Sequence, residues 1–143
     1  MTHGSHRIAR MTTALVLALS AASLGGCTAF TTGYAVLERD VEPADALPDA
    51  FIEQDSGDVA ELSSARFVGE HSGSSLWVLR GVDQGTICVL AYRDETAGVM
   101  ACGGERGPVE MSGPAGHFML VPDDYPTPDG ATRISDNVYA LSP

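Results

Sequence analysis

The sequence predicts a small, mainly β domain: an antiparallel sheet or meander, two-layered or sandwich-like, with a disulfide-bridged hairpin at its centre. From residue 65 onward, short apolar runs alternate with clusters of Gly, Ser, Pro and Asp, the pattern of strands and turns. Two cysteines, Cys88 and Cys102, lie in neighbouring runs. Residues 27–143, which follow the N-terminal leader described below, number 117. This length is enough for one domain that buries about two-thirds of its chain surface.

The first 26 residues have the composition of a helical export signal. Arg7 and Arg10 form a basic flank without an acidic residue, and residues 11–24 are apolar or small. This run is shorter and richer in Ala, Ser and Thr than a membrane-spanning helix of about 20 apolar residues. The arginines are not adjacent, which favours general export over the twin-arginine route. We therefore predict a signal peptide over residues 1–26.

The segment ends in Leu24, Gly25, Gly26 and Cys27, which resemble the bacterial lipobox of an aliphatic residue, two small residues and a cysteine. The resemblance implies cleavage between Gly26 and Cys27 and attachment of lipid, including palmitate, to Cys27. Two acyl chains anchor a protein stably where one does not. We therefore expect a lipoprotein on the extracytoplasmic face of the cell membrane, with membrane lipid as a partner. Two alternatives stay open: an ordinary signal peptide with Cys27 incidental, and an uncleaved anchor.

Residues 27–57 are predicted to form a lipidated, disordered acidic tether. The segment holds few large apolar residues, Pro43 and Pro48 interrupt it, and acidic residues recur along it. Like charges favour an extended chain, which could hold the domain tens of ångströms from the bilayer. A solvated linker is favoured over a specific acidic binding motif. A short patch, residues 50–52, could dock on the β-rich extracytoplasmic domain predicted over residues 58–143.

The predicted domain begins with one helical turn and continues as strands. Asp58 as N-cap and Glu61 three residues later suggest a capping box at the start of a turn over residues 59–62. Between the apolar runs that follow, the residues are those that supply turn dihedrals or side-chain hydrogen bonds. We predict strands over residues 65–71, 75–80, 86–92, 98–102, 109–112, 117–121, 132–134 and 138–141.

The third and fourth predicted strands form a hairpin that brings two cysteines together. With residues 94–96 as the turn, Cys88 lies opposite Cys102. Opposing residues of an antiparallel pair have Cβ atoms about 4.5 to 5.5 Å apart, close enough for a disulfide after slight adjustment. With Cys27 lipidated, these two cysteines remain as a pair, and an exported pair is expected to be oxidised. We predict a Cys88–Cys102 disulfide.

Both faces of this hairpin are apolar, because hydrophobic residues occupy even-numbered as well as odd-numbered positions along its strands. Such a hairpin belongs at the centre of the domain. We expect it to be covered by a second sheet layer or by Phe51 and Ile52 of the acidic segment. Trp77, in the preceding strand, is expected to be a core residue beside the disulfide rather than a ligand platform.

Charge restricts the partners. All 19 acidic residues follow the predicted cleavage site, as do six of the eight arginines, and the chain has no lysine, so the mature formal charge is −13. This charge argues against nucleic acid and anionic lipid headgroups as partners. A cell-envelope protein or a cell-wall component is the expected partner class, and the protein is expected to be a monomer.

Residues for catalysis are few. His71 and His117 are the two histidines that follow the leader, and the nearest string to a G-x-S-x-G elbow, residues 69–73, has His71 at its centre. We therefore expect no enzyme; the alternative is a small cell-envelope hydrolase that uses His71 or His117. For a binding module, the candidate surface lies near Trp77 and His71.

No metal or cofactor is predicted. There is no C-x-x-C, and the two histidines are not spaced as neighbours on a helix. The acidic residues 123–130 lack the alternating ligands and closing Glu of an EF-hand loop, so a solvated turn is favoured. Met100, Met111 and Met119 fall on strand runs and are better explained by packing than by copper binding.

Residues 38–105 contain, in order, the segments ERDVEPADALP, ARFVGEHSGSSLWVLRG, ICVLAY and ACGG. In this order the chain is similar to a group of small uncharacterised secreted or membrane-tethered proteins of actinobacteria. The resemblance implies origin and architecture, and it carries no catalytic motif and hence no functional residue. Our expectation is a membrane-anchored extracytoplasmic lipoprotein that acts as a non-catalytic binding or accessory module.

Overall fold

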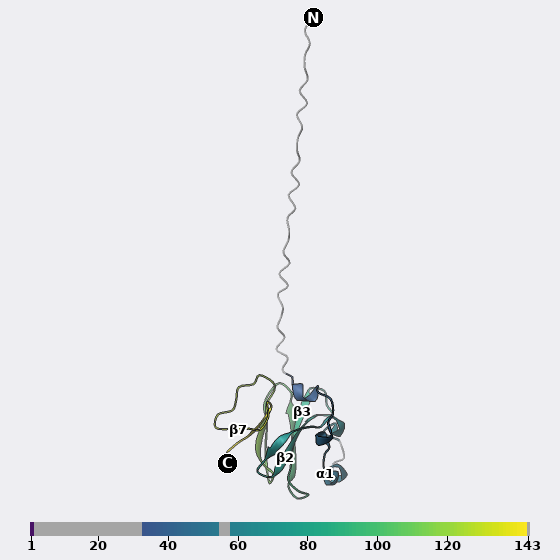
Figure 1. Ribbon diagram of the computed structural model, residues 1–143, viewed down its shortest axis with the longest axis vertical. Coiled ribbons are helices and arrows are strands. Elements are labelled where there is room, and N and C mark those ends of the chain that lie inside the picture. Colours follow the sequence, from purple (N-terminus) through teal and green to yellow (C-terminus); the bar gives the residue numbers. More distant parts are fainter. Residues whose placement is uncertain (2–32, 55–57, 143) are drawn as a thin grey trace.

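The computed structural model describes Met1, residues 33–54 and residues 58–142 (Figure 1). The predicted signal peptide, apart from Met1, and the predicted lipidation site Cys27 lie outside the described residues. Within the described ranges, no helix is both long and apolar enough to cross a membrane.

Two antiparallel four-stranded sheets form a sandwich, as predicted. Every strand end lies within two residues of its predicted position. The first sheet has the order β1-β2-β3-β4 and comprises β1 (Arg66–His71), β2 (Ser74–Arg80), β3 (Thr86–Tyr92) and β4 (Gly98–Gly104). The second has the order β5-β6-β8-β7 and comprises β5 (Val109–Gly113), β6 (Gly116–Leu120), β7 (Thr132–Arg133) and β8 (Val138–Ala140).

The β3–β4 hairpin has the predicted register and the predicted disulfide. Cys88 pairs with Cys102 across the ladder, and a disulfide joins them with their Cα atoms 4.1 Å apart. Residues 94–96 lie in the turn, as the register requires. Closing a loop of this length stabilises the fold by about 3 kcal/mol in the chain-entropy model.

The first core lies between the two sheets. It is built from alternate residues of β2 and β3 on one side and from β5, β6 and β8 on the other, because successive strand side chains point to opposite faces. Its largest fully buried side chain is Phe118. The buried members are Tyr34, Leu37, Leu76, Val78, Ile87, Val89, Ala91, Val109, Met111, Ala115, Phe118, Leu120, Val138 and Ala140.

A second core lies on the other face of the first sheet. Trp77, Cys88 and Leu90 are buried there together with Leu47, and Phe51 packs against them. The central hairpin is therefore covered on both sides, by the second sheet and by the N-terminal segment. In Figure 1 the layers run from the sheet with β7, through β2 and β3, to the segment with α1 (Asp49–Gln54).

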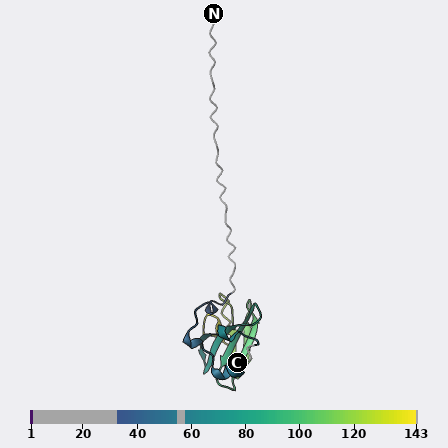
Figure 2. The same cartoon turned by 90° about the vertical axis from the view of Figure 1, so that its right-hand side faces the viewer.

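The prediction of a tether over residues 27–57 is wrong for its described part, residues 33–54, which lies against the strands (Figure 2). The segment forms η1 (Ala35–Leu37), η2 (Pro43–Asp45) and α1 (Asp49–Gln54). Of the predicted docking patch, Phe51 packs on the second core, whereas Ile52 remains 44% exposed. Leu47 and Phe51 are thus the apolar residues through which this acidic segment packs on the second core.

One buried carboxylate explains why an acidic segment packs here. Asp45 is 3% exposed and accepts hydrogen bonds from Arg39 Nη1 at 2.7 Å and from the amide of Phe67 at 2.8 Å. Arg39 also donates to the carbonyl of Phe67, at 3.2 Å, so the pair satisfies both backbone groups of this edge-strand residue. Burial raises the pKa of Asp45, but the bonds from Arg39 and two backbone amides outweigh it and lower the pKa to about 2.

The predicted helical turn over residues 59–62 is also wrong. Ala60 instead forms an isolated bridge with Gly81, and the amide of Glu61 donates to the carbonyl of Arg80 at 2.9 Å. The 3-10 helix η3 (Leu62–Ser64) begins after these contacts. Tertiary pairing with the end of β2 has outweighed the local capping signal.

Candidate functional site

A hollow of about 400 Å³ lies at one end of the sandwich, between the β1–β2 turn and the β5–β6 turn. The two turns belong to different sheets, and a hydrogen bond from Ser74 to Ala115 shows that they meet at the same end, where residues far apart in sequence come together. The structure thus brings His71 and His117 to one site. The lining consists of His71, Ser72, Arg93, Ser112, Gly113, Ala115, Gly116, His117, Phe118, Ala140 and Leu141.

Hydrogen bonds to one carbonyl hold the two turns together. Ser74, which is fully buried, donates from its hydroxyl to the carbonyl oxygen of Ala115 at 2.6 Å. Arg93 donates from Nη2 to the same oxygen and to the carbonyl oxygen of Ser72, both at 3.3 Å. The guanidinium therefore bridges the two turns at the hollow and is oriented by backbone atoms rather than by a carboxylate.

The β1–β2 turn has the conformation that presents its carbonyl to Arg93. Ser72 and Gly73 form a two-residue turn between His71 and Ser74, with φ angles of 51° and 81°. Positive φ at both central residues is typical of a type I′ hairpin turn. Ser72 is one of two non-glycine residues with positive φ in the described chain.

The two histidines have different surroundings. The ring of His71 lies edge-on to Phe118, with centroids 6.2 Å apart and planes at 88°. His117 Nε2 lies 2.6 Å from a carboxylate oxygen of Glu110. Both rings are partly buried, and among the described residues neither is hydrogen-bonded to a hydroxyl group. The hollow therefore combines two imidazole rings with one guanidinium.

The hollow differs in charge from three other surface hollows of similar size. Its lining contains Arg93 and two histidines and no Asp or Glu, and the nearby carboxylate of Glu110 contacts His117 rather than Arg93. In a chain with 19 acidic residues and eight arginines, this is the opposite of the average surface. The linings of the other three include carboxylates: Asp123 and Asp136; Glu61, Asp83 and Glu105; and Glu42 and Asp45.

The prediction of a binding surface formed by Trp77 and His71 is wrong for Trp77. Trp77 is 5% exposed and packs edge-on against Phe67 in the second core, in the same cluster as Cys88. Its indole nitrogen is buried without a hydrogen-bond partner among the described residues. The interpretation of Trp77 as a core residue near the disulfide is confirmed. His71 lies elsewhere, at the hollow.

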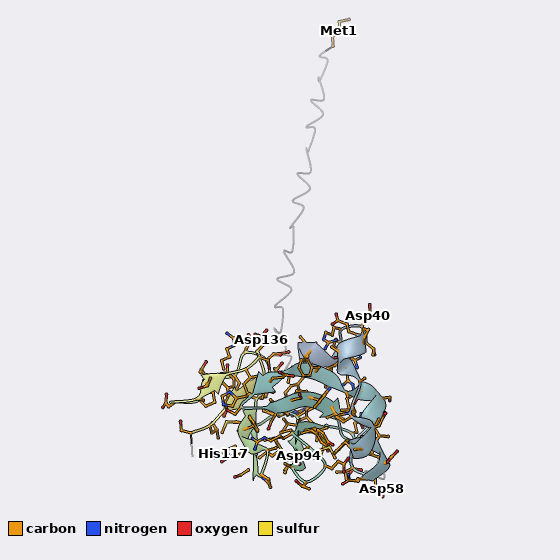
Figure 3. The ribbon with its side chains drawn as sticks, turned by 60° about the horizontal axis from the view of Figure 1, so that its bottom comes forward. Met1, Asp40, Asp58, Asp94, His117 and Asp136 are labelled. Atoms are coloured by element: carbon orange, nitrogen blue, oxygen red, sulfur yellow. A yellow bond between two sulfur atoms is a disulfide. The ribbon has the colours of Figure 1, made fainter. Side chains whose placement is uncertain are left out.

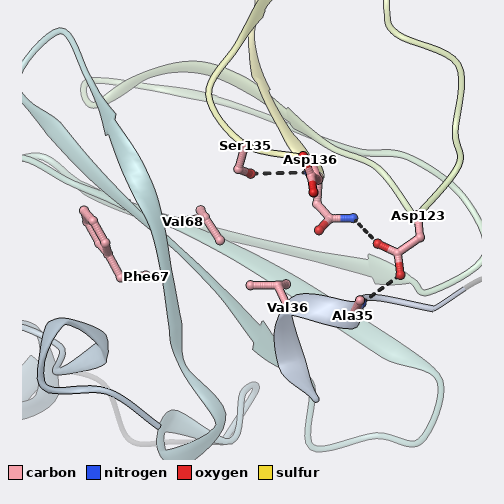
Figure 4. Close-up of a pocket in the computed structure, with 8 residues that line it drawn as sticks. Ala35, Val36, Phe67, Val68, Asp123, Ser135 and Asp136 are labelled. Atoms are coloured by element: carbon pink, nitrogen blue, oxygen red, sulfur yellow. Dashed lines mark hydrogen bonds between the residues drawn. The ribbon is translucent and has the colours of Figure 1, made fainter. Parts of the chain in front are cut away.

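At the opposite end, Asp123 holds the beginning of the described segment in place. Its carboxylate accepts hydrogen bonds from the amide of Ala35 at 2.7 Å and from the side chain of Asn137 at 2.9 Å (Figure 4). Both oxygens are thus engaged in structural contacts. Burial and the nearby carboxylate of Asp123 raise the pKa of the Tyr34 hydroxyl above its usual range. No group of three or more potential metal ligands occurs among the described residues.

Sequence reasoning identified His71 and His117 but missed Arg93, Ser74 and Ala115. Only the pairing of strands brings these residues together, and the carbonyl oxygen of Ala115 has no side-chain signature. Comparison of the chain with protein-family models, with curated proteins and with solved structures finds no match.

Proposed function

We propose that this protein is an extracytoplasmic lipoprotein, anchored through lipid on Cys27, whose domain is a non-catalytic binding module with its site at the His71–Arg93–His117 hollow. The observation that carries the binding site is the guanidinium of Arg93, which bridges two turns in a lining without Asp or Glu. The basic flank, the apolar run and the lipobox-like residues 24–27 support the anchor.

The position of the hollow suits an anchored binding module. Figure 3 shows His117 and Asp94 at one end of the domain and Asp136 and Asp40 at the other. The described segment starts at this second end, where the carbonyl of Gly33 accepts a hydrogen bond from the amide of Asp123 at 2.9 Å. A protein attached to a membrane through Cys27 would therefore present the hollow away from the bilayer.

The same contact shortens the reach of the anchor. Six Cα–Cα steps lead from Cys27 to Gly33, and at most about 3.6 Å per step this link spans no more than about 22 Å. The domain would then stay close to the membrane surface. A cell-envelope protein or a cell-wall component is the partner class that fits such a position, and the acidic charge argues against nucleic acid.

Cleavage and fractionation test the anchor. We expect the full chain expressed in an actinobacterial host to be found in the membrane fraction, to be released by Cys27→Ala, and to accumulate unprocessed with globomycin. A Cys27→Ala protein that stays in the membrane fraction would point to an uncleaved helix as the anchor.

Amide-resolved NMR tests the binding site. We expect soluble cell-wall fragments to shift resonances of the β1–β2 and β5–β6 turns and of Arg93, while resonances of the β2–β3 turn at the other end stay unchanged. If fragments and purified envelope proteins shift only signals outside the hollow, the assignment of this site is wrong.

One observation favours a hydrolase as the second candidate. His117 and Glu110 form an imidazole–carboxylate pair, and Ser112 lies opposite His117 in the β5–β6 ladder. Such a pair orients a general base in hydrolases. Hydrolysis of soluble ester or peptide substrates that is lost in both Ser112→Ala and His117→Ala would favour this function over binding.

A further inference from the structure

We propose that the hollow recognises a single carboxylate group carried on a small apolar body, such as the C-terminal end of a short peptide. This proposal rests on the proposed function, because it names the ligand class of that binding site. It is argued from the hydrogen bonds of Arg93, from the charge of the chain and from the apolar side chains of the lining.

Arg93 supplies the recognition of a carboxylate. Its Nη2 is used by the two turn carbonyls, of Ser72 and Ala115, and no described carboxylate forms an ion pair with the guanidinium. Nε and Nη1 have no hydrogen-bond acceptor among the described residues, and the side chain is exposed, so their donors are open to a ligand. A guanidinium with two neighbouring donors matches the geometry of a carboxylate, and the bonds to the turns lower the cost of ordering the side chain.

The charge of the chain favours one negative charge over two. The formal net charge is −11 for the whole chain and −13 without residues 1–26, so an approaching anion is repelled at long range, and the repulsion doubles for a dianion. Arg93 is the one arginine in the lining. The guanidinium balances the single charge of a carboxylate but only half of the charge of a phosphate dianion.

The remaining lining favours an apolar body next to the charged group. Leu141 is half-buried and offers apolar surface to a ligand, whereas Phe118 (1% exposed) and Ala140 (5% exposed) lie beneath it as a rigid apolar base. Gly116 lies against Phe118 so closely that a Cβ atom there would be 2.6 Å from Cε2 of the ring. The volume of about 400 Å³ lies at the small end of the usual range for ligand sites, which fits a fragment of one or two residues.

N-acetyl-Ala-Ala and its C-terminal amide form a matched pair of probes. They differ in charge and are nearly equal in size. In NMR titrations of the full-length chain at low ionic strength, we expect the acid to bind at the hollow and the amide to bind at least about tenfold more weakly, since hydrogen bonds to charged groups are among the stronger ones. Equal affinities would overturn the proposal. Tighter binding of inorganic phosphate than of the acid would overturn the preference for one charge.

Two arginine variants provide the control. Arg93→Gln should weaken binding of the acid about tenfold and leave the amide unchanged. Arg106→Gln removes the same charge from an exposed position outside the lining and should leave both affinities unchanged. Equal losses in the two variants would mean that general charge, and not Arg93, attracts the acid, which overturns the proposal.

The two proposals fail in different ways. If neither peptide binds but an uncharged cell-wall fragment shifts the turns around the hollow, the carboxylate assignment is wrong and the binding function stands. If peptides and envelope components alike shift no signal at the hollow, both proposals are wrong.

Discussion

The two faces of the first sheet are buried in different ways. One face packs against the second sheet through interdigitating strand residues, and the other packs against residues 33–54, a segment of short helices and irregular chain. The first core is specified many times over by strand alternation. The second depends on a few apolar residues and on the buried carboxylate of Asp45. This carboxylate accepts the hydrogen bond from the Phe67 amide that a neighbouring strand would otherwise accept. A sheet face can thus be covered without a second layer of regular structure.

The largest loss of stability is expected in the first core. Leu120 is fully buried between the sheets, so Leu120→Ala leaves a cavity and should lower the free energy of unfolding by about 4 kcal/mol. Urea unfolding monitored by circular dichroism measures this loss. If Leu120→Ala lowered the free energy of unfolding by less than the disulfide variant described next, the expectation that the first core contributes more stability than the second would be wrong.

The disulfide lies on the face that the N-terminal segment covers. Replacing both Cys88 and Cys102 with alanine should lower the free energy of unfolding by about 3 kcal/mol, because the unfolded chain is no longer cross-linked. Unfolding of this variant and of the oxidised wild type under the same conditions gives the difference. An unchanged free energy would show that the hairpin needs no cross-link.

Asp45 should account for part of the acid sensitivity of the second core. Its pKa is lowered to about 2 in the folded protein from an ordinary value of 3.8, so its stabilisation is present above about pH 4 and is lost as the pH falls through about 2. The Asp45→Asn protein should be less stable than wild type by about 2 kcal/mol at neutral pH. The difference should shrink in unfolding curves measured between pH 4 and pH 2; a constant difference would exclude this origin.

The smallest effect is expected at Ile52. This side chain belongs to α1 but is 44% exposed, so Ile52→Ala should change the free energy of unfolding by about 0.5 kcal/mol or less. The same urea titration serves as the measurement. A loss of more than about 1 kcal/mol would mean that Ile52 packs against the domain in solution.

The sequence predicts the regular part of the fold well because strand signals are local. Alternation, turn residues and the loop length of the β3–β4 hairpin determine the strands, the register and the Cys88–Cys102 pair. The packing of residues 33–54 could not be predicted in this way. In the sequence, Asp45 is one acid among many, and its contact with Phe67 is made across 22 positions.

The candidate site likewise has a part that the sequence reveals and a part that only the folded chain reveals. His71 and His117 are identifiable by residue type, whereas the role of Arg93 depends on two carbonyl oxygens that the hairpin turns bring together. Backbone acceptors have no sequence signature, so such a site becomes visible only in three dimensions. Trp77 illustrates the converse, because an aromatic residue that suggests a surface platform is used for packing.

The burial of Trp77 gives the protein an optical reporter of its own. It is the single tryptophan of the chain and lies under the N-terminal segment, in the cluster that contains Leu47 and Cys88. An indole in such surroundings emits at short wavelength, and its emission shifts to the red on contact with water. Fluorescence therefore records whether residues 33–54 stay on the sheet, and it can follow their release in real time without a label.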